Sequence, residues 1–174
     1  MKKWLLIIVA CLTLSLAACS ADEEKQSAEE LQNTIEEGTV GYEIVDGEVE
    51  EANNVPEEMK QEIFNALDEY ILSFNEKDLK RFEQTVSKKD ETYYKETMKE
   101  AEAVFKQYSI IDRQTQDETI SKYSKERVEV FLNITGRIVE AETNTEMAAT
   151  ARQIIVMVKE DGTWKVSSVH SINI

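Results

Sequence analysis

The residues that could carry acid/base chemistry are few and lie far apart in the sequence. The chain has a single histidine, His170, and the other candidates are Asp112 and the phenols of Tyr70 and Tyr94. Acid/base catalysis needs a carboxylate or imidazole of shifted pKa together with a hydroxyl donor for the developing oxyanion. No spacing ties these four residues together. We therefore expect no catalytic residues and no enzymatic activity, with an acid/base enzyme as the alternative.

Other common chemistries lack the residues that they need. One histidine and two cysteines exclude a His-rich metal site, a four-cysteine site and a disulfide scaffold. The sequence contains no Gly-rich phosphate loop, no Gly-x-Ser-x-Gly and no calcium-loop spacing. A net charge of −15 opposes binding to a phosphate backbone. We expect no metal, no cofactor and no nucleic-acid partner.

The first residues have the features of an export signal. Lys2 and Lys3 precede an almost wholly apolar stretch, residues 4–16, and small residues follow it. An apolar run of this length is too short to span a bilayer comfortably, because spanning takes about 20 residues. A basic start, a short apolar run and small residues are typical of a secretory signal that is later removed.

Leu16-Ala17-Ala18-Cys19 resembles the bacterial lipobox, Leu-x-(Ala/Gly)-Cys. The resemblance implies that residues 1–18 are a lipoprotein signal peptide and that Cys19 becomes a lipidated N-terminus, with a diacylglycerol thioether and further acyl chains such as palmitate. Several acyl chains would hold the protein at the cell membrane, facing outside the cytoplasm. An ordinary secretory signal with a chance cysteine is the alternative. Cys11 lies in the apolar run and would leave with the signal.

An acidic segment follows Cys19. Residues 20–55 carry twelve acidic side chains and one basic side chain, Lys25. Such a segment repels itself and has little apolar surface to bury. Residues 19–55 are therefore predicted to be a lipidated, flexible tether. Within it, residues 40–45 followed by Asp46-Gly47 are typical of a strand that enters a tight turn.

The remaining residues, 56–174, begin with three amphipathic helices. Pro56, Glu57 and Glu58 are typical of a helix start, and Asp78 and either Asp90 or Thr92 are predicted to cap two more helices. The apolar side chains recur at helical spacing. They are Met59, Ile63, Ala66, Leu67, Tyr70, Ile71 and Phe74 in the first helix, Leu79, Phe82 and Val86 in the second, and Tyr94, Met98, Ala101, Phe105 and Tyr108 in the third.

After Tyr108 the apolar period changes from 3.6 to 2, which predicts strands. A mostly polar edge strand is expected over 110–120, followed by strands over 127–139, 149–159 and 164–172. Gly136 suggests a bulge or bend, and Asp161-Gly162 is a strong hairpin signal. Helices followed by sequential strands predict an α+β fold, with N-terminal helices packed on a curved antiparallel sheet.

This order of elements resembles the NTF2-like (cystatin-like) cone over residues 56–174. The residues that carry the resemblance are Asn75-Glu76-Lys77-Asp78-Leu79, which open the second helix, and the hairpin Lys159-Glu160-Asp161-Gly162-Thr163-Trp164-Lys165-Val166. The resemblance implies a curved sheet wrapped over the long helix, with a cavity between them. NTF2-like proteins include isomerases, dehydratases, small-ligand carriers and protein-binding modules, so the fold does not decide the function.

We therefore expect a non-enzymatic binding module of the cell envelope, held at the membrane through the lipid on Cys19. Its partner would be a small ligand in the cone or another envelope protein on the sheet, and both a monomer and a homodimer fit the sequence. A cone filled by apolar side chains would favour the protein partner. The side chains that would fill such a cone are Phe131, Ile155, Met157 and Trp164.

Overall fold

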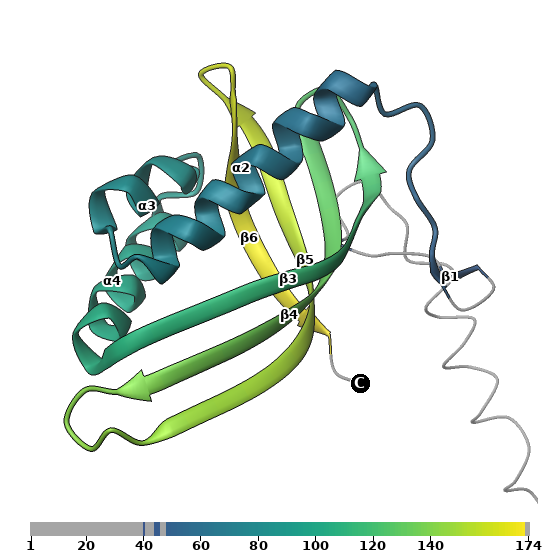
Figure 1. Ribbon diagram of the computed structural model, residues 1–174. Helices are drawn as coiled ribbons and strands as arrows, with labels where there is room; N and C mark the ends of the chain where they lie inside the picture. Colours follow the sequence, from purple (N-terminus) through teal and green to yellow (C-terminus); the bar gives the residue numbers. More distant parts are fainter. Residues whose placement is uncertain (1–39, 41–43, 46–47, 173–174) are drawn as a thin grey trace, which may run out of the picture. The chain divides into compact units, whose positions relative to one another are not determined.

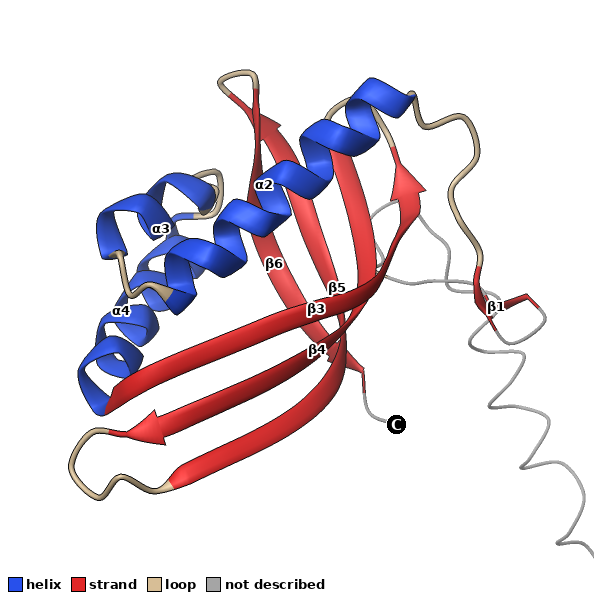
Figure 2. Cartoon of the chain, in the orientation of Figure 1, coloured by secondary structure: helices blue, strands red, loops and turns tan. Residues whose placement is uncertain are grey.

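The described part of the chain is a layer of helices over a curved antiparallel sheet (Figures 1 and 2). The computed structural model describes residues 40, 44–45 and 48–172, which all belong to a compact unit, Val40–Ile174. Cys19, the apolar leader and most of the predicted tether lie outside the described residues. The α+β architecture predicted from the sequence, with N-terminal helices packed on a curved antiparallel sheet, is confirmed.

Three helices form one layer. They are α2 (Glu57–Asn75), α3 (Leu79–Thr85) and α4 (Glu91–Gln107). The predicted caps are confirmed, because the Asp78 carboxylate accepts from the Arg81 N–H and the Asp90 carboxylate accepts from the N–H groups of Thr92 and Tyr93. None of the described helices is both long enough and apolar enough to cross a bilayer.

Four long strands form the main sheet in the order β3-β4-β5-β6, each antiparallel to the next. They are β3 (Tyr108–Tyr123), β4 (Arg127–Glu140), β5 (Glu146–Glu160) and β6 (Thr163–Ile172). Asp161 and Gly162 both have positive φ, 53° and 80°, as a type I′ hairpin requires. Tyr108 is the first residue of β3, so the prediction that it belongs to the third helix is wrong.

The sheet curves around the helices, and α2 contacts both β3 and β6 (Figure 1). The register of β3 against β4 shifts between Gln116 and Thr119, where Asp117 has a φ of 56°. Such a bulge bends a strand and increases its twist. Gly136 pairs in regular register with Arg113 and Ala149, so the strands have no bulge at this residue and that prediction is wrong.

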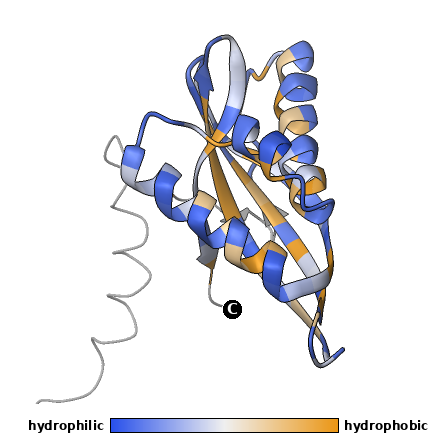
Figure 3. Cartoon of the chain, turned by 90° about the vertical axis from the view of Figure 1, so that its left-hand side faces the viewer, coloured by the Kyte–Doolittle hydropathy of each residue, from blue (hydrophilic) through white to orange (hydrophobic). Residues whose placement is uncertain are grey.

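The inner face of the sheet and the helices enclose the main core. On β4 its members are Val128, Val130, Leu132 and Ile134, as the alternation predicts. In Figure 3 much of the strands beneath the helices has the colour of hydrophobic residues. Of the aromatic residues predicted to pack, Phe74, Phe82 and Trp164 are buried, and Phe105 packs edge-on against Phe74 and Phe82.

The outer face of the sheet carries a second, smaller cluster. Phe131, Ile154 and Val156 are buried there, and Val40 and Val49 pack against them. A short antiparallel pair, β1 (Ile44–Val45) and β2 (Glu48–Val49), confirms a strand at the end of the predicted 40–45 run, whereas Asp46 and Gly47 lie outside the described residues. Nearer α2, the Ala52 N–H donates to the Ile120 carbonyl at 2.7 Å. Contacts of the folded unit therefore begin before Pro56.

Candidate functional site

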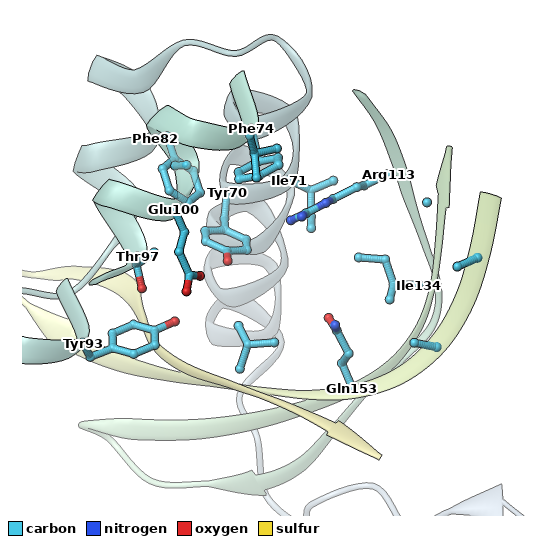
Figure 4. A pocket seen from close by; sticks show the side chains of 16 residues that line it. Tyr70, Ile71, Phe74, Phe82, Tyr93, Thr97, Glu100, Arg113, Ile134 and Gln153 are labelled. Atoms are coloured by element: carbon cyan, nitrogen blue, oxygen red, sulfur yellow. The ribbon is translucent and has the colours of Figure 1, made fainter. Parts of the chain in front are cut away.

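A half-open cavity of about 420 Å³ lies between the helices and the inner face of the sheet (Figure 4). All three described helices and all four strands of the main sheet contribute to its wall. The helices supply aromatic and polar side chains, among them Tyr70 and Tyr93. This is the space between sheet and helices that the NTF2-like resemblance implies, and its size suits a small organic molecule.

Small residues on the sheet create the floor of the cavity. The small residues are Gly136, Ala149 and Ala151. Gly136 pairs with Arg113 on one side and with Ala149 on the other, and Ala151 pairs with Ile134 in the next row. A Cβ added to Gly136 would meet no atom within 4 Å. Hydrogen and methyl side chains at these positions leave free volume above the sheet, where larger side chains would fill it.

Arg113 is the basic residue of the cavity wall, and its backbone is held tightly. The Asn75 side chain, at the end of α2, donates to the Arg113 carbonyl at 2.9 Å and accepts from the Arg113 N–H at 2.9 Å. The guanidinium lies over the Phe74 ring, 3.8 Å from its centroid. Phe74 and Asn75 thus fix both the strand and the side chain at this point.

No carboxylate or other acceptor among the described residues pairs with the Arg113 guanidinium. Burial lowers the pKa of Arg113, and the nearby Tyr70 phenol opposes that shift. Arginine nevertheless stays protonated in proteins. The cavity therefore contains a positive charge that has lost part of its hydration and has gained no counter-ion from the part of the chain that the structure describes.

Other polar groups enter the cavity from the helices. Figure 4 shows the oxygens of Tyr70, Tyr93 and Glu100 on one side, whereas Arg113 and Gln153 come from the sheet on the other side. Burial raises the pKa of both phenols above the ordinary value. Tyr70 and Tyr93 are therefore neutral at physiological pH and can donate hydrogen bonds.

The acid/base candidates taken from the sequence do not meet in this cavity. Of the four, only Tyr70 lines it. His170 is exposed and pairs with Ile154, whose side chain belongs to the outer cluster. Asp112 precedes the inward-facing Arg113 on β3 and therefore faces the other way, and the Tyr94 hydroxyl donates to Glu83 at 2.6 Å.

The cone is filled in one part and hollow in another. Ile155, Met157 and Trp164 belong to the main core and are nearly inaccessible, as predicted for a filled cone. Phe131 lies in the outer cluster, so its predicted place inside the cone is wrong. Alternation alone assigns this residue correctly, because Phe131 is out of phase with Val130 and Leu132 on β4.

Sequence reasoning did not identify Arg113, Tyr93, Glu100 or Gln153 as site residues. For two of them a signal was present: Arg113 and Gln153 occupy inward positions of their strands, in phase with Ile111 and Ile155. A charged or amide side chain at an inward position needs either a partner or a cavity. Within the described ranges, no group of three His, Cys, Asp or Glu residues could hold a metal ion.

Comparison with known proteins supports the fold alone. No family model matches the sequence, and no curated protein is significantly similar. Among solved structures, a proposed aromatic ring hydroxylase from Novosphingobium aromaticivorans is 11% identical, with a TM-score of 0.60, over 68% of this chain and 96% of that chain.

Two further structures match in the same way. A type 2 hexachlorocyclohexane dehydrochlorinase, LinA, is 13% identical with a TM-score of 0.56, over 65% of this chain and 83% of its own. An NTF2-like superfamily protein from Salmonella enterica is 17% identical with a TM-score of 0.52, over 65% and 89%. The described domain therefore has the NTF2-like fold, whose neighbours include enzymes.

Proposed function

We propose that this protein is a lipid-anchored binding module that faces outside the cytoplasm and holds a small organic molecule in its cone. The observation that carries the proposal is the cavity of about 420 Å³, into which polar groups of α2, α4, β3 and β5 converge above an apolar floor. Binding sites for small molecules have this composition. The lipobox-like Leu16-Ala17-Ala18-Cys19 supports the membrane anchor.

The cavity is tested by filling it. Gly136→Phe places a large side chain in the open space above β4, whereas Thr135→Phe adds the same side chain at an exposed position on the opposite face. Binding of 6-fluoro-2-naphthoate to the full chain in detergent micelles is followed by ¹⁹F NMR, with micelles alone as the blank. Gly136→Phe should weaken binding at least about tenfold, and Thr135→Phe should leave it unchanged. Equal affinities in both variants would contradict the proposal.

The anchor is tested by exchanging each cysteine for alanine. Cys19→Ala removes the proposed acylated thiol and should move the protein from the detergent phase to the aqueous phase in a phase-partition assay. Cys11→Ala is the matched control, because this residue lies in the segment that would be cleaved off. Detergent partitioning that persists in Cys19→Ala would contradict the lipid anchor.

An acid/base enzyme is the second candidate, and one arrangement favours it. The Glu100 carboxylate lies at the cavity with the phenols of Tyr70 and Tyr93 (Figure 4), which supplies a base and two hydroxyl donors. Several structures of similar fold are named as enzymes. A bound compound that is converted by the native protein, and bound but not converted by Glu100→Gln, would establish the enzyme and reject the binding module.

A further inference from the structure

We propose that the cavity is selective for an organic monocarboxylate, whose carboxylate pairs with the Arg113 guanidinium while its apolar body lies on the floor around Gly136 and Ala151. This inference rests on the proposed function, since it specifies the ligand of the same cavity. It starts from a half-buried guanidinium of the cavity wall that has no counter-ion among the described residues.

The free-energy cost of burying an unpaired charge indicates that Arg113 binds a ligand. A charge taken out of water costs free energy unless a partner of opposite charge or several hydrogen bonds compensate it. Arg113 gains the Phe74 ring beneath it, which is a weaker compensation than a carboxylate. Three other arginines of the same domain have carboxylate partners, since Arg81 pairs with Glu69, Arg127 with Glu129 and Arg137 with Glu146. Arg152 is exposed to solvent, which Arg113 is only in part. A bound carboxylate would supply the partner that Arg113 lacks.

The geometry favours a carboxylate. A guanidinium is a planar fork of donors, which matches the two oxygens of a carboxylate. The Phe74 ring covers one face of this fork, and Asn75 fixes the backbone that carries it, so the donor edge is held before a ligand arrives. Such preorganisation reduces the entropy that binding would otherwise lose.

The charge balance of the cavity favours a monoanion over a phosphate. Its wall contains one cation, Arg113, and one carboxylate, Glu100, and both phenols are neutral. A phosphate monoester carries close to two negative charges at neutral pH. It would have a single guanidinium to pair with and would be repelled by Glu100. A bound monocarboxylate leaves the wall and the ligand together with one net negative charge, whereas a phosphate monoester would leave them with close to two.

Two probes of equal size separate charge recognition from cavity binding. These are 6-fluoro-2-naphthoate and its neutral amide, 6-fluoro-2-naphthamide, titrated by ¹⁹F NMR against the full chain in micelles. The native protein should bind the acid at least about tenfold more tightly than the amide. Arg113→Gln should abolish this difference while it leaves amide binding in place. Arg152→Gln is the control, because this arginine is exposed on β5, one residue from Gln153 and on the other face.

The outcomes distinguish this inference from the proposed function. Equal affinities for acid and amide that Arg113→Gln does not change, with binding still sensitive to Gly136→Phe, would overturn the carboxylate preference and leave the binding cavity standing. No binding of either probe would overturn both. Displacement of the acid by inorganic phosphate at equal concentration would also overturn the preference for a monocarboxylate.

A stability measurement separates a ligand-binding role from a structural one. Arg113→Met keeps an apolar contact with Phe74 and removes the unpaired charge, so the melting temperature without ligand should rise by a few degrees. A residue kept for binding at the expense of stability behaves in this way. A clear fall in the melting temperature, together with an unchanged preference for the acid probe, would assign Arg113 to the fold instead.

Discussion

The inner face of the sheet has two halves that differ in how completely they are filled. The packed half contains Val128, Val130, Ile155, Met157 and Val166, all almost inaccessible beneath the helices. The hollow half contains Arg113, Gly136, Ala149, Ala151 and Gln153, which line the cavity. Both halves include residues of β4 and β5 and share one alternation of inward and outward side chains.

What changes along β4 and β5 is mainly the size of the side chains. In the packed half Val130 pairs with Ile155, whereas in the hollow half Gly136 pairs with Ala149. Periodicity assigns both pairs to the inner face, because it reports which side a residue faces and not how much space it fills. The cavity is thus encoded by a loss of side-chain volume within an unbroken pattern. The packed half should therefore contribute most of the stability of the fold, and the hollow half should bind the ligand.

The largest effect is expected from truncating the packed half. Met157→Ala removes a side chain that is 0% exposed and should lower the free energy of unfolding by about 2–5 kcal/mol. Gln153→Ala, on the same strand and face, borders open space and should lower it by less than about 1 kcal/mol. Urea denaturation of both variants measures the difference. Equal losses would show that the two halves do not differ in packing.

Most of the fold follows from the sequence, since caps, hairpin residues and alternation are local signals. Asp78, Asp90 and Asp161-Gly162 each act within a few residues of their position, and each prediction is confirmed. The site is harder to predict because it joins α2, α4, β3 and β5. Nothing local places Tyr70 and Arg113 on one cavity, or His170 outside it.

Neutralising either of two carboxylates at opposite ends of β5 should change the free energy of unfolding less than Met157→Ala does. Glu160, at the packed end, has a side chain that is 15% exposed and accepts from the Ser87 hydroxyl at 2.8 Å and the Lys88 N–H at 3.2 Å. Burial opposes its ionisation, but these donors and Lys165 outweigh that effect and lower its pKa. Glu146, at the hollow end, pairs with Arg137 and is 56% exposed.

The lowered pKa of Glu160 makes the stability of the protein depend on pH. Because folded Glu160 holds its proton less tightly than the unfolded chain, its stabilisation is present above the ordinary value of 4.5 and is lost as the pH falls through the folded value. Glu160→Gln should therefore lower the unfolding free energy by about 0.5–1 kcal/mol at pH 7 and by less at pH 3. Glu146→Gln should have a smaller effect, because an exposed pair is screened by water. A larger loss of unfolding free energy in Glu146→Gln than in Glu160→Gln would contradict the expectation that the carboxylate at the packed end contributes more to stability.

The only gain of stability in this series is expected at the floor of the cavity. Gly136 lies in regular strand pairing with open space at its Cβ position, so Gly136→Ala needs no rearrangement. The methyl group restricts the unfolded chain and should raise the unfolding free energy by about 0.5–1 kcal/mol. Gly162→Ala also meets no neighbouring atom, but the φ of Gly162 is +80°, so this variant should lose stability through backbone strain.

The two glycines thus separate the demands of the backbone from those of a ligand. Gly162 is required by its turn, whereas nothing in the backbone requires Gly136. If the hollow half exists for a ligand, Gly136→Ala should bind 6-fluoro-2-naphthoate more weakly while it unfolds at a higher urea concentration, because the methyl group occupies ligand space. A variant that is more stable and binds the probe as well as the native chain would show that the ligand does not use the space above Gly136.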